Sequence, residues 1–290
     1  MNKHGQVREA VSEAYARAIR TPSEGGACCA PPQKGVVVKV AGYTREELDA
    51  LPPEAVINSF GCGNPLAFSE VRAGDVVLDL GSGAGIDILL AGKKVGPNGR
   101  VIGIDMTDEM IEKARENIAR SGLTNVDVRK GIIEELPVES SSVDWVISNC
   151  VINLSPEKDK VFAEIARVLK PGGRMLVSDI VVESLPDRLR EDPGLYSSCI
   201  AGAISETEYL AGLRRAGLAE VEVRERIVYN AVQLEALIGS ELGGGRPGSC
   251  GCGGTTSGEP TAADTVSSIV GKVWSAKVFA RKPIRRIGPG

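Results

Sequence analysis

The chain has 290 residues, of which 42% are hydrophobic and 25% are charged, an ordinary composition for a globular protein. Its formal net charge of -4 argues against nucleic acid as the main partner, because nucleic-acid binding relies on a strongly basic surface. No run of residues is long and apolar enough to cross a membrane, and the charged start of the chain does not form a secretory signal. We therefore expect a cytoplasmic protein with neither a nucleic-acid nor a membrane partner, and as a separate expectation a monomer.

The cysteine and histidine content limits the kinds of reactive site that the protein can contain. The chain contains seven cysteines and one histidine, His4. In a cytoplasmic protein, cysteines more often bind metals or act in catalysis than form structural disulfides. A single histidine excludes a Ser-His-Asp triad and any zinc site built from several histidines. Thiols are therefore the main candidates for the reactive groups of this protein.

The first part of the chain predicts two helices separated by a break. Apolar residues repeat at helical spacing over 6–20. Thr44 and Glu47 have the spacing of a capping box, which predicts a short helix at 45–50. The Gly- and Pro-rich segment between these helices carries two adjacent cysteines, Cys28 and Cys29.

From about residue 74, short apolar strands alternate with amphipathic helices, which is typical of a parallel sheet covered by helices on both faces. The strands expected in this part are 76–80, 100–105, 126–130, 143–149 and 174–180. The helices expected are 86–94, 108–120 after the N-cap Thr107, and one from the N-cap Ser155, with Pro156 in its first position, to Gly172-Gly173. Later elements are a helix at 206–216 with a capping box of Ser205 and Glu208, strands at 221–229 and 274–282, and a glycine-rich loop at 243–258. The predicted fold class is α/β, with a doubly wound, mostly parallel Rossmann-like sheet and a smaller C-terminal α+β part.

The strand at 76–80 runs directly into the glycine-rich turn GSGAG and then into a helix. Such a turn lets a ligand approach the backbone closely, and its N–H groups favour a negative charge. Asp105 ends the next strand, where a carboxylate accepts hydrogen bonds from ribose hydroxyls. The G-x-G-x-G spacing of Gly81, Gly83 and Gly85 lacks the third position of the dinucleotide motif and resembles the first motif of S-adenosylmethionine (SAM) methyltransferases. We therefore favour SAM over NAD, with a purely connecting turn as the other alternative.

Three well-separated cysteines fall near the expected cofactor pocket. Cys150 directly follows the fourth strand, at the carboxyl edge where open α/β sheets bind ligands. Cys62 lies in a tight turn before the core domain, and Cys199 follows the fifth strand. Thiolates select soft, thiophilic elements, so three converging thiols would form a site for such an element. The alternative is that each cysteine is a small buried core residue.

Five strings of the sequence together resemble the arsenite SAM methyltransferase family: YTREELDALPPEAVINSFGCGNP, LDLGSGAGIDILL, GIDMT, SNCVINL and SSCIAGAI. The resemblance covers residues 43 to about 230 and implies methyl transfer from SAM to thiol-bound trivalent arsenic, giving mono- and dimethylated arsenicals in arsenic detoxification. It implies that Cys62, Cys150 and Cys199 bind the arsenic of arsenite, the substrate. It also implies that Cys28 or Cys29 takes part in arsenic loading or forms a transient disulfide with Cys62, and that a thiol reductant, glutathione or thioredoxin, is a co-substrate.

The expected chemistry needs no general base. Trivalent arsenic held by sulfur keeps a lone pair and has no proton to lose, which suits a domain without histidine. The cofactor site is expected to use one set of residues for the methionine end and another for the ribose and adenine. The first set is Asp79, Gly81, Ser82, Gly83 and Gly85, and the second is Asp105, Met106, Ile133 and Glu134, with Asn149 against the cofactor beside Cys150.

We divide the chain into three parts: 1–70, helical and cysteine-bearing; 71–183, the SAM-binding Rossmann-like domain; and 184–290, an arsenic-binding part that includes the loop 243–258. In that loop, Cys250 and Cys252 are either exposed thiols or a dithiol that captures arsenite. Three rival functions remain: a SAM methyltransferase acting on another small molecule, a thiol-based arsenic or metal binder without turnover, and an NAD-dependent dehydrogenase.

Overall fold

The computed structural model describes residues 3–20, 43–58, 63–66, 69–190, 199–235 and 262–284. The strands are β1 (Val76–Leu80), β2 (Arg100–Asp105), β3 (Val126–Lys130), β4 (Val143–Asn149), β5 (Leu169–Val182), β6 (Ala219–Val228) and β7 (Val273–Arg281). They form one seven-stranded sheet in the order β3-β2-β1-β4-β5-β7-β6. Strands β1 to β5 are parallel, whereas β7 pairs antiparallel with both β5 and β6. The predicted α/β class with a mostly parallel sheet is confirmed.

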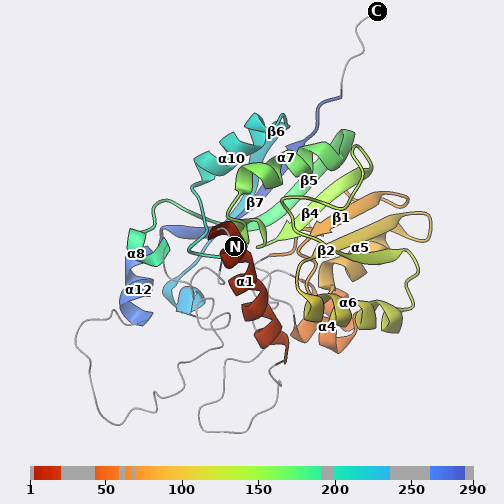
Figure 1. Ribbon diagram of the computed structural model, residues 1–290, viewed down its shortest axis with the longest axis horizontal. Helices are drawn as coiled ribbons and strands as arrows, with labels where there is room; N and C mark the ends of the chain where they lie inside the picture. The colour runs from red at the N-terminus through yellow and green to blue at the C-terminus, as the bar shows by residue number, and fades with distance from the viewer. Residues whose placement is uncertain are drawn as a thin grey trace, which may run out of the picture.

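Helices cover both faces of this sheet (Figure 1). They are α1 (Lys3–Arg20), α3 (Arg45–Asp49), α4 (Pro53–Ile57), α5 (Ile86–Val95), α6 (Asp108–Ser121), the 3-10 helix η2 (Ile152–Leu154), α7 (Lys158–Val168), α8 (Asp187–Arg190), α10 (Glu206–Arg215) and α12 (Ala262–Ile269). None of the helices within the described ranges has the length and apolar character needed to cross a membrane.

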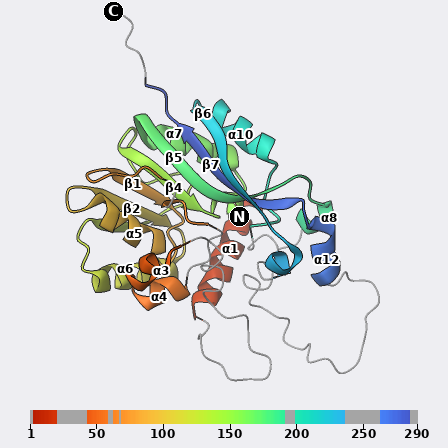
Figure 2. The ribbon, with the colours of Figure 1, turned by 180° about the vertical axis from the view of Figure 1, so that it is seen from behind.

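The alternation of side chains along β1 separates the two faces. Leu78 and Leu80 belong to the apolar cluster that contains residues of α7 and α10, whereas Val77 belongs to the cluster that contains residues of α5 and α6. Helix α7 accordingly lies in front of the sheet in Figure 1 and behind it in Figure 2. This two-layered cover leaves the carboxyl ends of β1, β2 and β4 as the edge where ligands bind in such folds.

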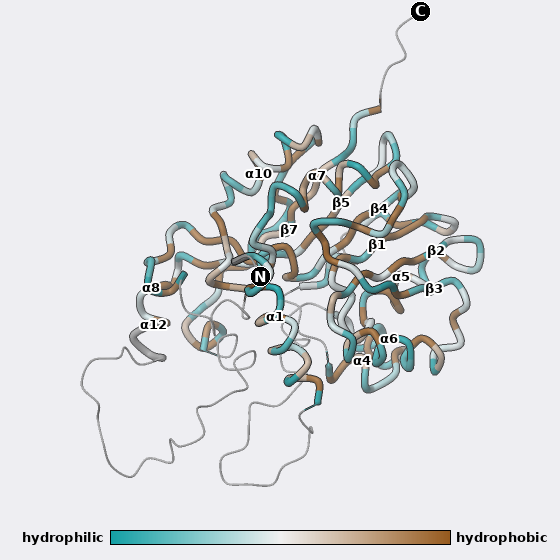
Figure 3. Tube along the Cα trace, viewed as in Figure 1, coloured by the Kyte–Doolittle hydropathy of each residue, from teal (hydrophilic) through white to brown (hydrophobic). Residues whose placement is uncertain are grey.

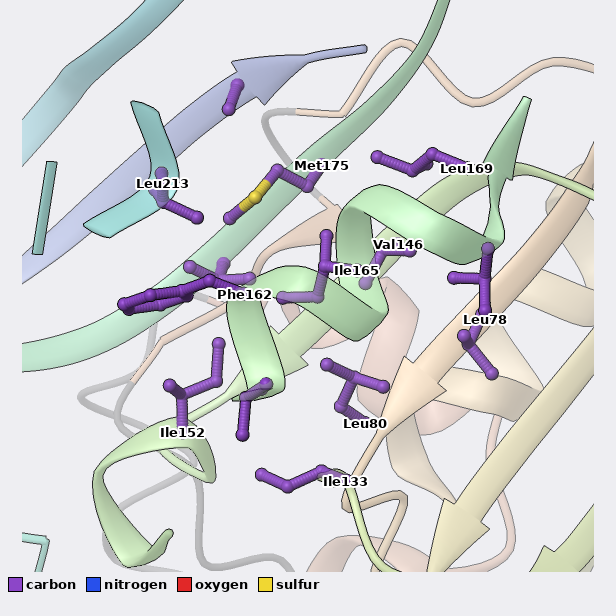
Figure 4. Close-up of a cluster of buried hydrophobic side chains, with 14 of the residues drawn as sticks. Leu78, Leu80, Ile133, Val146, Ile152, Phe162, Ile165, Leu169, Met175 and Leu213 are labelled. Atoms are coloured by element: carbon purple, nitrogen blue, oxygen red, sulfur yellow. The ribbon is translucent and has the colours of Figure 1, made fainter. Parts of the chain in front are cut away.

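The cluster under α7 shows what fixes this helix on the sheet (Figure 4). Phe162 and Ile165 of α7 are buried against Leu80 of β1. The Phe162 ring also packs on Tyr209 of α10, with 5.1 Å between ring centroids. Each fully buried side chain of this size contributes about 1.5–3 kcal/mol relative to an exposed one. Helix α7 and the loop before it are therefore held rigidly beside the carboxyl end of β4.

Helix α1 brings the start of the chain to the carboxyl edge of the sheet. One of its faces carries Val7, Val11 and Tyr15, which pack with the cluster that contains Cys150 and Leu154. The trace of α1 accordingly changes between teal and brown along its length in Figure 3, as expected for an amphipathic helix. Helix α1 also contacts α6, so it lies against the first half of the sheet as well.

Local capping signals are confirmed at two helices and wrong at a third. The capping boxes of Thr44 with Glu47 and of Ser205 with Glu208 are both present. Ser155 does not begin a helix: α7 starts at Lys158, with Glu157 as its N-cap. The Ser155 hydroxyl instead donates to Glu134 at 2.6 Å and accepts from the backbone N–H of Glu157 at 3.0 Å, a local turn that competes with helix formation.

The end of the same helix also differs from the prediction. We expected it to reach Gly172-Gly173, but it ends at Val168 and Leu169 already pairs with Val143 of β4. Leu169 is extended, with a ψ of 135°, two residues before Pro171. Proline disfavours helical conformation in the residue before it, which explains the earlier end.

The C-terminal part of the chain completes the sheet. Strands β6 and β7 add to its edge beyond β5, and Lys282 N–H donates to the carbonyl of Gly173 at 2.8 Å. Residues after 184 thus share one sheet with the domain at 71–183. The loop at 243–258 lies outside the described residues.

Candidate active site

The first three N–H groups of the glycine-rich turn between β1 and α5 are hydrogen-bonded to residues of β2. The N–H groups of Gly81 and Ser82 both donate to the Ile104 carbonyl, at 2.8 and 2.9 Å, and Gly83 N–H donates to the Asp105 carboxylate at 3.0 Å. The prediction that these N–H groups face a negatively charged ligand is therefore wrong for these three. The turn still needs glycine, because a Cβ on Gly81 would lie 2.2 Å from the Val151 side chain.

Asp105 holds the turn in place from the end of β2. Its Oδ2 accepts from Gly83 N–H, and its Oδ1 accepts from Thr107 N–H at 2.9 Å. Burial raises the pKa of Asp105, while these hydrogen bonds act to lower it. The Thr107 hydroxyl and Met106 N–H also donate to this carboxylate, so several donors hold it at the edge of the cavity.

A cavity opens beside this turn, with an empty volume of about 940 Å³ including its open mouth. Such a volume suits a cofactor-sized ligand. Most of the residues expected from the sequence line it: Gly81, Ser82, Gly83, Gly85, Asp105, Met106, Ile133, Glu134, Asn149 and Cys150. Asp79 does not line it and is buried behind the turn. Ile133 lines the cavity and also belongs to the core cluster under α7.

Helix α1 forms one wall of the cavity, and none of its residues was predicted to belong to the site. Arg8, Val11 and Tyr15 line it. Arg8 is fixed by Glu134, 3.1 Å away, and by Glu157, 2.5 Å away. Lys160 and then Arg8 hold the pKa of Glu157 down at about 2, so this anchor stays charged. The amphipathic pattern of α1 indicated a helix, but nothing in the pattern indicated what its apolar face covers.

Asn149, at the end of β4, connects the cavity wall to the turn that follows Cys62 in sequence. Its side-chain oxygen accepts from Gly63 N–H at 3.0 Å, and its amide nitrogen donates to the Gly63 carbonyl. The same nitrogen lies 3.1 Å from the Tyr43 hydroxyl and 3.4 Å from Asp87 Oδ2. Gly63 also packs on β5, where a Cβ would lie 1.9 Å from the Ser178 hydroxyl. Asn149 therefore lines the cavity, as expected, and also binds the backbone of the turn that contains Gly63.

Cys150 and Cys199 lie side by side at the carboxyl end of β4. The Cys199 thiol donates to the Cys150 carbonyl with 2.6 Å between sulfur and oxygen, and Cys150 N–H donates to the Ser178 carbonyl at 2.8 Å. Both cysteines have a φ of 62°, in the left-handed region that residues other than glycine rarely adopt. Such strain persists only where the surroundings impose it, and it concentrates at functional sites. Cys150 is disulfide-bonded.

Cys62, Cys28 and Cys29 lie outside the described residues, as do Cys250 and Cys252. Within the described ranges, His, Cys, Asp and Glu side chains form no group of three suited to a metal ion. The structure thus brings together two of the three thiols that were expected to converge.

Two ionisable groups interact near Cys199: Asp179, which is buried, and Lys158, which is half-buried. Burial lowers the pKa of Lys158 to about 8, against attraction to Asp179 and Cys199. Burial also raises the pKa of Asp179 to about 7, and its Oδ2 accepts from the Tyr209 hydroxyl at 3.2 Å. A cationic side chain therefore lies within electrostatic reach of the Cys199 sulfur.

Comparison with known proteins shows which family the chain belongs to. Residues 72–217 match the family model described as "Methyltransferase domain". A solved arsenic(III) SAM methyltransferase from Chlamydomonas reinhardtii is 32% identical, with a TM-score of 0.62, over 89% of this chain and 76% of that one. The chain belongs to the arsenite methyltransferase family. The predicted relationship is thus confirmed.

Two curated arsenite methyltransferases show the same relationship. The protein from Halobacterium salinarum is 43% identical over 75% of this chain and 59% of its own length. The human protein is 34% identical over 69% of this chain and 56% of its own length. The chain therefore spans somewhat more than half the length of these curated family members.

Proposed function

We propose that the chain is a SAM-dependent arsenite methyltransferase that produces mono- and dimethylated arsenicals. The observation that carries this proposal is the contact between the Cys199 thiol and the Cys150 carbonyl beside a cavity lined by the glycine turn. Cys62, Cys150 and Cys199 are assigned as the arsenic ligands, with Cys28 or Cys29 in arsenic loading. The reaction belongs to arsenic detoxification in the cytoplasm, by a monomer.

The cavity fits SAM as methyl donor. Asp105 lines the cavity at the end of β2, where a carboxylate can accept hydrogen bonds from ribose hydroxyls. The buried Ser82 hydroxyl on the cavity wall has no hydrogen-bond partner among the described residues, as expected if a ligand supplies one. When bound, SAM supplies an electrophilic methyl group on a sulfonium. Met106, Ile133 and Glu134 are assigned to the adenine and ribose end, and Asp79 acts from behind the turn.

The residues of this chain mainly position the reactants. The thiolates would hold trivalent arsenic so that its lone pair points at the methyl carbon. Transfer would form an arsenic–carbon bond and break the sulfur–methyl bond, whose electron pair would stay on the leaving sulfur, so no residue of this chain would have to remove a proton. Such positioning supplies a large part of the barrier reduction in bimolecular reactions.

A thiol reductant is the second co-substrate. The disulfide at Cys150 has to be reduced before that sulfur can bind arsenic. Two reductant thiols give two electrons and two protons to the disulfide and themselves become a disulfide. Methylation also oxidises arsenic formally from trivalent to pentavalent, so a further thiol pair is needed before a second methylation. Glutathione and thioredoxin both have this chemistry.

The test is incubation of the protein with arsenite, glutathione and SAM, followed by arsenic speciation. The proposal predicts methylated arsenicals and an equal amount of S-adenosylhomocysteine for each methyl group transferred. Arsenite binding without methylated product would instead indicate a thiol-based arsenic binder. SAM binding without arsenite turnover would indicate a methyltransferase for another small molecule.

A further inference from the structure

Val151, the residue directly after Cys150, packs against the first residue of the glycine turn. A Cβ placed on Gly81 would lie 2.2 Å from one γ-methyl carbon of Val151 and 2.7 Å from the other, so the valine side chain occupies the space that glycine leaves free. Both residues line the cavity. A single apolar contact therefore joins the neighbour of a proposed arsenic ligand to the turn beside the proposed cofactor site.

The backbone on each side of this contact is fixed by hydrogen bonds to a neighbouring strand. Gly81 N–H donates to the Ile104 carbonyl of β2 at 2.8 Å, and the φ of 70° at Gly81 is one that glycine adopts readily. On the other side, Cys150 N–H donates to the Ser178 carbonyl of β5 at 2.8 Å. The left-handed φ of Cys150 then turns the chain, and Val151 packs against the end of β1.

The 3-10 helix η2 fixes Val151 from the direction away from the turn. The Val151 carbonyl accepts from Leu154 N–H at 3.0 Å. The Asn153 side-chain nitrogen donates to the Ile180 carbonyl of β5 at 2.6 Å, and the Lys158 ammonium donates to the Asn153 carbonyl at 3.2 Å. Valine is branched at Cβ, so its side chain has few conformations. Val151 is thus a stiff spacer between the glycine turn and the loop that begins at Cys150.

We propose that Val151 is a positioning residue for methyl transfer, because its contact with Gly81 sets the separation between arsenic held at Cys150 and the methyl donor. This inference rests on the proposed function and adds to it a residue that acts through packing alone. A misplacement of about 1 Å between reacting groups can cost about a hundredfold in rate. Loss of both γ-methyl groups would leave a gap between the turn and the loop, so that nothing would hold the two sites at one separation.

The test compares wild type with Val151→Ala, Val151→Thr and Val76→Ala. Threonine is also branched at Cβ, so Val151→Thr keeps the contact with Gly81. Val76→Ala is the matched control, because Val76 is another half-buried valine packed against the cluster under α7, at the opposite end of β1 from the turn. Titration calorimetry measures the affinity of each reduced protein for SAM alone and for arsenite alone. A single turnover of protein loaded with both measures the rate of methyl transfer.

The expected result is a loss of rate without a loss of binding. In Val151→Ala the single-turnover rate should fall about tenfold or more, with SAM and arsenite affinities within about threefold of wild type. Arsenic K-edge X-ray absorption should show the same number of sulfur ligands in Val151→Ala as in wild type. Val151→Thr and Val76→Ala should both methylate arsenite within about threefold of the wild-type rate.

Four outcomes overturn the inference. The first is a Val151→Ala rate within about threefold of wild type. The second is an equal loss of rate in Val76→Ala, which would indicate general loosening of the cluster under α7. The third is a Val151→Thr rate as low as that of Val151→Ala. The fourth is a loss of SAM or arsenite affinity in Val151→Ala as large as its loss of rate, which would indicate a damaged binding site. Failure of the wild-type protein to methylate arsenite would instead overturn the proposed function, and this inference with it.

Discussion

The sulfur of Cys199 lies 2.6 Å from the carbonyl oxygen of Cys150, and both residues have a left-handed backbone with a φ of 62°. The chain separates these two cysteines by 48 residues and a complete strand, yet β5 returns the second beside the first. Cys150 also lines the cavity that contains the glycine turn. The contact therefore joins the proposed arsenic site to the proposed cofactor site.

Replacement of either cysteine tests this connection. Cys150→Ser and Cys199→Ser should each reduce methylation by about a hundredfold or more, because a hydroxyl is a poor ligand for a soft element and misplaces the arsenic. SAM affinity should stay within a few-fold of wild type. Measurement of methylated arsenic and of SAM binding on the same samples checks both statements. Near-normal activity of one variant would remove that residue from the site.

Asp105→Ala should weaken SAM binding rather than arsenite binding. Loss of the carboxylate removes the acceptor of Gly83 N–H and Thr107 N–H as well as the proposed ribose contact. Hydrogen bonds to a charged group contribute about 1.5–3 kcal/mol, so SAM should bind at least about tenfold more weakly. Arsenite binding should change little. Weakened arsenite binding with unchanged SAM affinity would contradict the assignment.

Gly63→Ala tests whether the turn after Cys62 has to dock on β5. A Cβ at Gly63 would lie 1.9 Å from the Ser178 hydroxyl, so the turn must move. We expect overpacking to cost about 1–3 kcal/mol locally and arsenite affinity to fall. The double variant Gly63→Ala with Ser178→Gly removes the obstructing hydroxyl and should recover part of the lost affinity. Equal losses in the single and double variants would show that the collision is not the cause.

Arg8→Ala tests the contact of α1 with the cavity wall. Removal of the pairs with Glu134 and Glu157 should loosen α1 and raise the dissociation rate of SAM, which stopped-flow displacement measures. Arg17→Ala is the control, because Arg17 pairs with Glu13 on the exposed side of the same helix. Equal dissociation rates for wild type and Arg8→Ala would argue against a cover that α1 holds over the ligand.

The pH dependence of stability tests the buried state of Asp87. Its folded pKa of about 6 exceeds the ordinary unfolded value, so the folded protein binds more protons, and the free energy of unfolding of the ligand-free protein should fall as pH rises from about 4 through 6. Asp87→Asn removes this contribution and should gain stability over wild type by up to about 3 kcal/mol across that range. Asp79, Glu47 and Asp179 are present in both proteins. Urea unfolding at each pH measures both free energies. If the difference between wild type and Asp87→Asn did not change with pH, the raised pKa of buried Asp87 would be contradicted.

Periodicity was sufficient to predict the sheet of this protein. The strands of the first half are short apolar runs, and each lies within about two residues of its expected bounds except β5, which begins early because Leu169 pairs with β4. The capping box of Ser205 and Glu208 was predictable because its contacts are local. Ser155 was not, because its hydroxyl bonds to Glu134, which is 21 residues away in sequence.

The site was only partly predictable for a similar reason. The glycine turn, Asp105 and Cys150 follow strands directly, so their place at the carboxyl edge could be read from the sequence. The contacts of Arg8 and Asp87 depend on which residues the fold brings opposite them. An acidic residue two positions after a glycine turn was the available signal for Asp87, but its burial depends on Tyr43, 44 residues earlier.

In the proposed reaction, Cys150 and Cys199 bind one arsenic atom together with a third thiol. Arsenic K-edge X-ray absorption of the reduced protein with one equivalent of arsenite counts these ligands directly. We expect three sulfur ligands in the wild type and two in Cys199→Ser, with the lost sulfur replaced by oxygen. The same sulfur count in both proteins would contradict it.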